Sequence, residues 1–322
     1  MNRREFLAVA LAAPFLLAAS PSAFARRLGG TPLALVTADT EAEVVAVELA
    51  SGRIARRLPT LEGPRSIESV LGTTAVVAHT SEGSVSLIDA PSLRVWRVLR
   101  AFSEPRYTAA APGGRHAYVT DSGRGELVVL DLERGRVVHR TELGGPARHV
   151  TLGRDGTLWT ALGSKALEVV LVDTREPERP RLSRRLRPPF LAHDVGFTPD
   201  GRQVWVTSGD SRRIAVYDAA SLRLRFTLSA DAPPQHVAFA DTVAYVTSGD
   251  DATLRVHRLR DGKLLRTTAV PVGSYNVSLG WGRVLTPSLE RGTLCVLDEA
   301  GRRVEVVRVA PAAHDACFVM SV

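Results

Sequence analysis

A short β-rich segment recurs along the chain about every 42 residues, and this repeat constrains the fold more than any other feature. The copies are Leu35-Val36-Thr37, Val76-Val77-Ala78, Tyr118-Val119-Thr120, Leu158-Trp159-Thr160, Trp205-Val206-Thr207, Tyr245-Val246-Thr247 and Val284-Leu285-Thr286. Their third residues lie at 37, 78, 120, 160, 207, 247 and 286, so the steps are 41, 42, 40, 47, 40 and 39 residues. Seven copies of one supersecondary unit predict a closed repeat architecture.

Each copy belongs to a unit of four short strands. A second alternating strand that ends in an acid follows it, as in Leu127–Asp131, and a third follows that, as in Arg136–Arg140. A shorter strand precedes it and ends in a glycine turn such as Asp155-Gly156, where glycine supplies the positive φ of a tight hairpin. No helical periodicity interrupts this pattern. The sequence therefore predicts an all-β fold, a seven-bladed β-propeller with four-stranded antiparallel blades.

The first repeat begins with the second strand of a blade, at Leu33–Ala38. We expect its missing innermost strand to come from the C-terminal segment Ala316–Ser321, so that the two ends pair and close the ring. The step of 47 residues predicts a longer surface loop in the fourth blade, around residues 174–189, where proline and arginine are frequent.

The N-terminal segment has the pattern of an export signal. Arg3-Arg4 precedes the apolar run Ala8–Ala19, and Ala23-Phe24-Ala25 has the small residues of a cleavage site. Twelve apolar residues are too few for a membrane span, which needs about 20, although an uncleaved anchor stays an alternative. We expect a cleaved signal at residues 1–25 and a single propeller domain at 26–322, without a transmembrane segment. The paired arginines resemble a twin-arginine signal, which implies export in the folded state to the periplasm or the cell exterior.

The formal net charge is +7, and almost all positive residues are arginines scattered along the chain. A scattered charge argues against a nucleic-acid partner, which would favour a basic patch or stripe. Two cysteines, Cys295 and Cys317, are too few for a disulfide framework, and the sequence leaves open whether they pair.

Polar residues precede the innermost strand of most blades. One equivalent position holds Tyr107, His149, Asp194, His236, Asn276 and Asp315, and the position before it holds Arg106, Arg148, His193, Gln235, Tyr275 and His314. Four of the eight histidines are in this set. Because the innermost strands surround the channel of a propeller, we expect both sets to ring one channel mouth, with loop acids such as Asp39, Asp121, Asp210 and Asp250 on the same face.

Histidine, aspartate and tyrosine at one mouth are suited to metal binding or proton transfer. The metal hypothesis names His149, His193, His236 and His314 as ligands, with neighbouring carboxylates to orient the rings. Two alternatives stay open: a polar ring that only binds water and neighbouring blades, and a site for a small organic ligand or cofactor, whose carboxylate or phosphate the arginines would hold.

Tyr118-Val119-Thr120-Asp121 and Tyr245-Val246-Thr247-Ser248 resemble the core motif of the YVTN-repeat, YncE-like β-propeller family of exported proteins, over residues 31–322. The resemblance implies the fold and export, and this architecture hosts scaffolds and enzymes alike. We predict a scaffold that binds a small molecule or a protein partner at the channel mouth. The alternative is a metal- or cofactor-dependent enzyme, a lactonase-like hydrolase or an oxidoreductase, although no catalytic motif such as Gly-x-Ser-x-Gly occurs.

Overall fold

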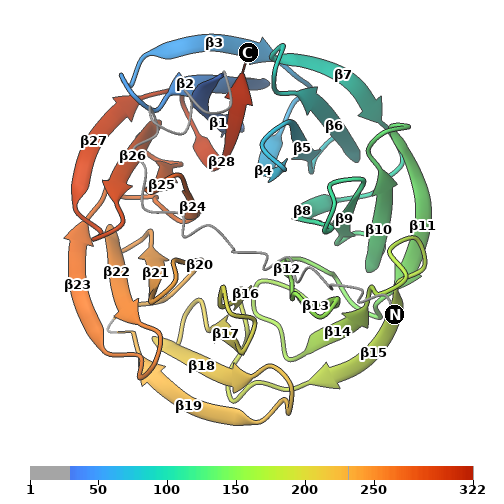
Figure 1. Cartoon of the computed structure of the whole chain (residues 1–322), viewed down its shortest axis with the longest axis vertical. Coiled ribbons are helices and arrows are strands. Elements are labelled where there is room, and N and C mark those ends of the chain that lie inside the picture. Colours follow the sequence, from blue (N-terminus) through green and yellow to red (C-terminus); the bar gives the residue numbers. More distant parts are fainter. Residues whose placement is uncertain (1–29, 231, 322) are drawn as a thin grey trace, which may run out of the picture.

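The computed structural model describes residues 30–230 and 232–321, which form seven four-stranded sheets around a central axis (Figure 1). Blades 1 and 2 contain β28 (Ala313–Ser321), β1 (Thr31–Ala38), β2 (Glu43–Glu48) and β3 (Ile54–Pro59), then β4 (Pro64–Val70), β5 (Thr74–His79), β6 (Ser84–Asp89) and β7 (Arg94–Leu99). Blades 3 and 4 contain β8 (Pro105–Ala110), β9 (His116–Asp121), β10 (Glu126–Asp131) and β11 (Arg136–Glu142), then β12 (Val150–Leu152), β13 (Thr157–Ala161), β14 (Val169–Asp173) and β15 (Arg181–Leu186).

The remaining blades follow the same plan, with the innermost strand first in each. Blade 5 contains β16 (Val195–Phe197), β17 (Gln203–Thr207), β18 (Arg213–Asp218) and β19 (Leu224–Ser229). Blades 6 and 7 contain β20 (Val237–Phe239), β21 (Val243–Ser248), β22 (Thr253–Arg258) and β23 (Leu264–Ala269), then β24 (Ser278–Gly280), β25 (Arg283–Ser288), β26 (Thr293–Asp298) and β27 (Arg303–Arg308). The predicted seven-bladed propeller is confirmed.

The ring closes where β28 pairs with β1, as the sequence predicts. The two strands are antiparallel and bring Leu33 opposite Val319 and Leu35 opposite Cys317. In Figure 1 the C-terminal strand lies beside β1, in the same sheet. Pairing the two ends completes the four strands of blade 1 and covers the inner edge of β1.

The core lies between adjacent blades and is made by their two middle strands. In blade 4, for example, β13 places Trp159 against Phe197 and Tyr217 of blade 5, with ring centroids 6.1 Å apart in both pairs. The outermost strands are mostly exposed, and β15 carries four polar residues on the outside of the ring. The predicted long loop at 174–189 is therefore corrected: its second half is strand β15, because an exposed outer strand tolerates arginines while its backbone pairs with β14.

A β-bulge lies at the start of the innermost strand in blades 1 to 6. In blade 5, for instance, the amide of His193 donates to the carbonyl of Thr207 (2.8 Å), and the amide of Thr207 donates to the carbonyl of Asp194 (3.0 Å), so two residues oppose one. The opposed pairs are His314/Asp315, Arg65/Ser66, Arg106/Tyr107, Arg148/His149, His193/Asp194 and Gln235/His236. Bulges redirect side chains and are frequent beside functional sites.

A threonine of the repeated motif holds the bulge in blades 1, 3, 5 and 6. The hydroxyl of Thr120 accepts from the amide of Tyr107 (3.1 Å) and lies 2.7 Å from the carbonyl of Arg148 in the next blade. Thr207 makes the equivalent bonds to Asp194 and Gln235. The motif therefore links neighbouring blades at the channel.

Blades 2, 4 and 7 lack this threonine and have Ala78, Ala161 and Pro287 at its position. Blade 4 also corrects the alignment of the fourth repeat. In blades 5 and 6 the first valine of the innermost strand pairs with the residue before the threonine, as Val195 does with Val206. In blade 4 the equivalent valine, Val150, pairs with Thr160 itself. The residue that faces the bulge of blade 4 is therefore Ala161. The amide of Arg148 donates to the Ala161 carbonyl, and the Ala161 amide donates to the His149 carbonyl. Alanine has no hydroxyl, so the blade that carries His149 lacks the threonine link.

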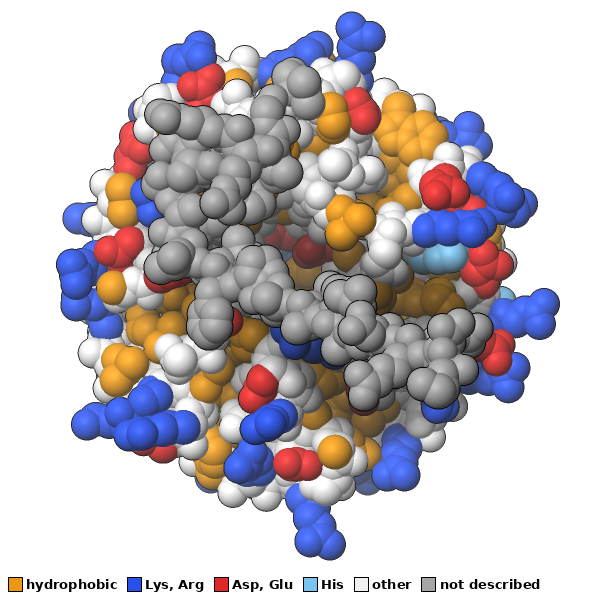
Figure 2. All heavy atoms as spheres, in the orientation of Figure 1, with side chains coloured by type: hydrophobic (Ala, Val, Ile, Leu, Met, Phe, Trp, Pro, Cys, Tyr) orange, Lys and Arg blue, Asp and Glu red, His pale blue; other side chains and the backbone are white. Residues whose placement is uncertain are grey.

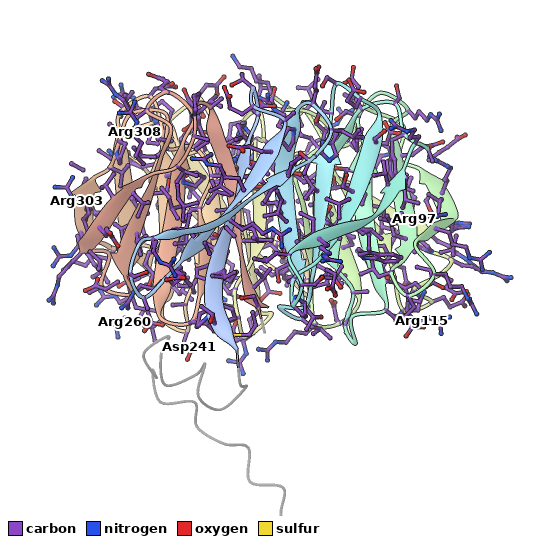
Figure 3. The ribbon with its side chains drawn as sticks, turned by 90° about the horizontal axis from the view of Figure 1, so that it is seen from above. Arg97, Arg115, Asp241, Arg260, Arg303 and Arg308 are labelled. Atoms are coloured by element: carbon purple, nitrogen blue, oxygen red, sulfur yellow. The ribbon has the colours of Figure 1, made fainter. Side chains whose placement is uncertain are left out.

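The ring has two different faces (Figure 3). Asp241 and Arg260, which lie in turns after β20 and β22, are on one side, and Arg308, at the end of β27, is on the other. We call the first side the turn face and the second, from which the chain enters the innermost strands, the entry face. Figure 2 shows lysine and arginine side chains spread around the rim, without one basic block on the face in view. Among the described residues, none belongs to a helix that is long and apolar enough to cross a membrane.

Candidate functional site

Three of the predicted histidines meet in the channel at the entry face. His149, His193 and His236 each offer a ring nitrogen, and these nitrogens lie within 4.8 Å of one another. The ring centroids of His149 lie 4.6 Å from His193 and 4.7 Å from His236. Tyr107 packs on the cluster, 4.3 Å from the His149 centroid. We call these three imidazoles the histidine cluster; they come from blades 4, 5 and 6.

Hydrogen bonds fix the proton position in two of the rings. Nδ1 of His193 lies 3.0 Å from the carbonyl oxygen of Ser164, which can only accept, so Nδ1 carries the hydrogen. Nδ1 of His236 lies 3.3 Å from Oδ2 of Asp194 and is placed to donate to that carboxylate. Both rings therefore keep Nε2 as a free lone pair, which is the arrangement found in metal-binding histidines.

His149 is the most buried member of the cluster. Its side chain is 1 % exposed, and neither ring nitrogen has a hydrogen-bond partner of good geometry, although the backbone of His193 lies near enough to favour the charged ring slightly. Burial pulls the pKa of His149 well below 6.5, and the nearby His193 and His236 lower it further. A buried polar group without a partner is costly and is rare in folded proteins.

Two further histidines of the mouth, His193 and His314, also have lowered pKa values. Burial lowers the pKa of His193 to about 4, and His236 contributes to that shift. Burial lowers the pKa of His314 to about 3, with a further contribution from Arg65. A neutral imidazole is the form that coordinates a metal, so low pKa values keep these rings available for coordination over a wide pH range.

Asp194 and Asp315 occupy equivalent positions and share a structural role. Each carboxylate accepts from the next amide of its own strand and from an inner-strand amide of the next blade, Val237 for Asp194 (3.1 Å) and Ile67 for Asp315 (3.1 Å). Burial raises the pKa of Asp315 to about 6. Only Asp194 has a histidine as a further partner, which makes it the positioning residue of the cluster.

Three predicted site residues do not join the cluster. Nδ1 of His314 donates to the carbonyl of Arg65, and the side-chain amide of Asn276 donates to the carbonyl of His314 (2.8 Å). The hydroxyl of Tyr275 donates to Asp250 (2.7 Å), at the rim. These side chains form hydrogen bonds between blades 6, 7, 1 and 2. Of the four histidines that the metal hypothesis names, the described residues bring together His149, His193 and His236.

Arginines gather over the other half of the mouth, in blades 2 to 4. Arg65 pairs with Asp39 (3.0 Å) and Arg106 with Glu104 (3.3 Å). Nε of Arg106 and Nε of Arg148 are buried without a hydrogen-bond partner. Burial lowers the pKa of Arg106, and the positive charges of Arg148 and Arg65 lower it further, so the three guanidinium groups share one region.

Below the cluster, the channel contains a cavity of about 210 Å³. Tyr107, His149, Asp194, His236, Asn276 and Asp315 line it. Burial raises the pKa of Tyr107 to about 12, so its hydroxyl is protonated near neutral pH. The site therefore offers neutral imidazoles, a phenol and two carboxylates around a small space.

Sequence reasoning missed three features of this region. Arg65 precedes the innermost strand of blade 2 at the position that Arg106 and Arg148 occupy in blades 3 and 4, so comparing the repeats could have found it. The loop after β13 brings the Ser164 carbonyl to His193. Glu68 lies in the innermost strand β4 and lines the channel cavity. No sequence pattern indicates either position. Cys295 and Cys317 are both buried and free, so they form no disulfide.

The fold resembles several solved structures, and the low identities limit this likeness to the fold. A functionally unknown protein from Desulfotomaculum acetoxidans has a TM-score of 0.78 at 12% identity, with 90% of this chain and 99% of that chain covered. Apo AztD from Citrobacter koseri has a TM-score of 0.70 at 12% identity (90% and 98% covered), and a protein from Lactobacillus plantarum has 0.74 at 12% (90% and 99% covered).

No curated protein matches the sequence. A family model described as outer membrane protein assembly factor BamB matches residues 81–313, from the second blade to the start of the closing strand. The finer resemblance to YVTN-repeat proteins stays a prediction, and the signal segment lies outside the described residues. Because the match spans more than half of the 322 residues, the chain belongs to the family described as outer membrane protein assembly factor BamB.

Proposed function

We propose that this protein is an exported propeller that binds one divalent transition-metal ion in its channel through His149, His193 and His236. The observation that carries the proposal is the convergence of three imidazoles: Nδ1 of His193 and of His236 faces an oxygen acceptor, and neither nitrogen of His149 has a partner of good geometry. A bound cation would satisfy the buried nitrogen of His149. Imidazole ligands favour zinc, copper, iron or nickel.

The geometry requires a small adjustment on binding. Zinc–nitrogen bonds are about 2.0 Å long, so ligand nitrogens around a tetrahedral ion are separated by about 3.3 Å. The cluster nitrogens lie within 4.8 Å of one another, and the rings would have to move closer by about 1 Å. Asp194 is placed to hold His236 during this closure, and its negative charge favours a cation in the cluster.

Three protein ligands leave a fourth position open, as in sites that bind an exchangeable ligand. The channel cavity lies next to that position, which favours a scaffold that presents a metal to a small molecule or to a protein partner at the entry face. The family description, an outer membrane assembly factor, supports a protein partner and a location outside the cytoplasm. The open fourth position on the metal is also the one observation that specifically supports the lactonase-like hydrolase hypothesis.

Titration calorimetry of the metal-free protein with zinc and with copper tests the proposal. We expect one ion per chain for the wild type and loss of that binding in His149→Ala. His139→Ala is the matched control, because His139 lies in β11, outside the channel. Equal binding by the two variants, or none by the wild type, would exclude the cluster as a metal site. A lactone-hydrolysis assay of the loaded protein separates an enzyme from a scaffold.

A further inference from the structure

We propose that the channel end on the turn face is a second, independent binding site, for a small uncharged apolar molecule that carries one hydrogen-bonding group. This end contains a cavity of about 590 Å³, which is within the range of small-molecule sites. Its lining is mainly apolar and includes Leu71, Trp281, Phe318 and Met320. Trp281 packs edge-on against Phe318, with centroids 5.6 Å apart.

Two hairpin turns at this cavity carry large apolar residues where the backbone disfavours them. Leu71-Gly72 and Trp281-Gly282 have positive φ at both residues, 53° and 71° in the first and 48° and 74° in the second. Such turns prefer asparagine or glycine at the first position, and a bulky residue with positive φ is an outlier. The equivalent turn of blade 3 has positive φ at both residues and uses Gly113-Gly114, whereas in blades 4 and 5 only the glycines of Asp155-Gly156 and Asp200-Gly201 have positive φ.

Core packing does not account for Leu71. Leu93 and Leu222 also adopt positive φ, but both pack against buried clusters, whereas Leu71 is 72 % exposed. A ring atom of Trp281 lies 3.9 Å from the position that a Cβ on Gly72 would occupy, so the two turns meet across the cavity. Trp281 packs against the buried cluster that contains Phe318, so Leu71 is the turn residue at this cavity that core packing leaves unexplained. Exceptions to local rules are expected at functional sites.

Glu68 gives the site its polar group and indicates the charge of the ligand. It lines both this cavity and the smaller channel cavity, as do Ser278 and Ala316, so the two spaces meet at this point. Burial, with help from the charge of Asp315, raises the pKa of Glu68 to about 8. A protonated carboxyl group can donate and accept a hydrogen bond, and it complements an uncharged polar group in an apolar pocket.

Fluorescence titration with N-phenyl-1-naphthylamine, an uncharged aromatic amine, tests this proposal. We expect saturable binding at one site per chain, weakened at least tenfold in Trp281→Ala and unchanged in Trp96→Ala. Trp96 is the matched control because it is 44 % exposed on the outer strand β7. Glu68→Gln should keep the affinity within about twofold, since the amide still hydrogen-bonds, and Glu68→Ala should lower it.

If Trp281→Ala does not fold, Leu71→Asn replaces it at the exposed turn tip and should also weaken binding. The metal-free and zinc-loaded proteins should bind the probe equally, so failure here is distinguishable from failure of the metal site. Non-saturable binding, or equal effects of Trp281→Ala and Trp96→Ala, would overturn the proposal.

Discussion

The two ends of the central channel have opposite chemistry although the same seven innermost strands surround both. At the entry face, β-bulges gather histidine, arginine, aspartate and tyrosine around a cavity of about 210 Å³. At the turn face, hairpin turns place leucine and tryptophan beside a larger, mainly apolar space of about 590 Å³. Both cavities share Glu68, Ser278 and Ala316.

This contrast shows where a repeated blade can vary without loss of the fold. The middle strands are buried between blades and stay apolar, whereas the first and last residues of each innermost strand are free to differ between blades. At both ends unusual residues stand where individual blades depart from the repeat: Ala161 stands at the threonine position beside His149, and Leu71 and Trp281 adopt positive φ at their turns.

The largest expected effect tests whether the two ends act separately. His193→Ala combined with His236→Ala leaves one imidazole and should lower zinc affinity more than 100-fold, whereas Trp281→Ala at the other end should leave it within about twofold. Competition with a chromophoric chelator measures both. An equal loss in the two proteins would show that the ends are coupled and that the contrast is wrong.

Asp194→Asn sharpens the comparison within the entry face. Removing the charge that positions His236 should lower zinc affinity by about tenfold, because partners of metal-binding histidines typically contribute 10–100-fold. Asp315→Asn is the matched control. Asp315 accepts the same two backbone hydrogen bonds as Asp194 but forms no ion pair with a histidine. Its replacement should therefore change stability and leave zinc affinity unaltered. Equal zinc affinities in the two variants would remove Asp194 from the site.

Glu68 and the channel histidines predict opposite pH dependence. The pKa of Glu68 in the folded chain, about 8, lies above its ordinary 4.5, so the folded state binds more protons and its stability falls as pH rises from about 4.5 to 8. His193, with a folded pKa of about 4, has the reverse sign, and its contribution is lost as pH falls from 6.5 to 4.

Glu68→Gln should therefore remove a loss of stability of about 3–4 kcal/mol between pH 5 and pH 8. Urea unfolding of the metal-free wild type and variant at pH 5, 6, 7 and 8 measures this difference. If the free energy of unfolding changed with pH equally in the two proteins, Glu68 would be ionised at all four pH values. That result would contradict its burial at an apolar end of the channel.

The smallest expected effect concerns the exposed turn. Leu71→Asn should raise the free energy of unfolding by about 0.5–1 kcal/mol, because asparagine adopts positive φ more readily and little buried apolar area is lost. Thermal unfolding measures the change. Destabilisation would show that Leu71 serves the fold, which would leave the exposed turn tip without a functional explanation.

The fold could be predicted from the sequence because the repeat is strongly periodic. The threonine of Tyr118-Val119-Thr120 recurs since its hydroxyl joins adjacent blades, and Leu33–Ala38 without a preceding strand required closure by the C-terminus. The fourth repeat was placed one residue early because Thr160 stands beside Ala161, and only strand pairing shows which of them faces the bulge.

The site was predicted in part. Adjacent positions in successive blades brought His149, His193 and His236 to one mouth, but the same reasoning placed His314 with them. The ring of His314 is held by the Arg65 carbonyl, a contact across the ring closure that sequence spacing does not reveal. The seventh repeat was also placed one residue early: Leu285 pairs with Val296 as Tyr245 pairs with Val256, so Pro287 stands at the threonine position.

X-ray absorption at the metal edge of the zinc-loaded protein tests the central claim most directly. We expect one ion with three imidazole nitrogens at about 2.0 Å in the wild type, and loss of this signal in His149→Ala. A spectrum without imidazole scattering, or one that His149→Ala leaves unchanged, would contradict a metal site in the channel.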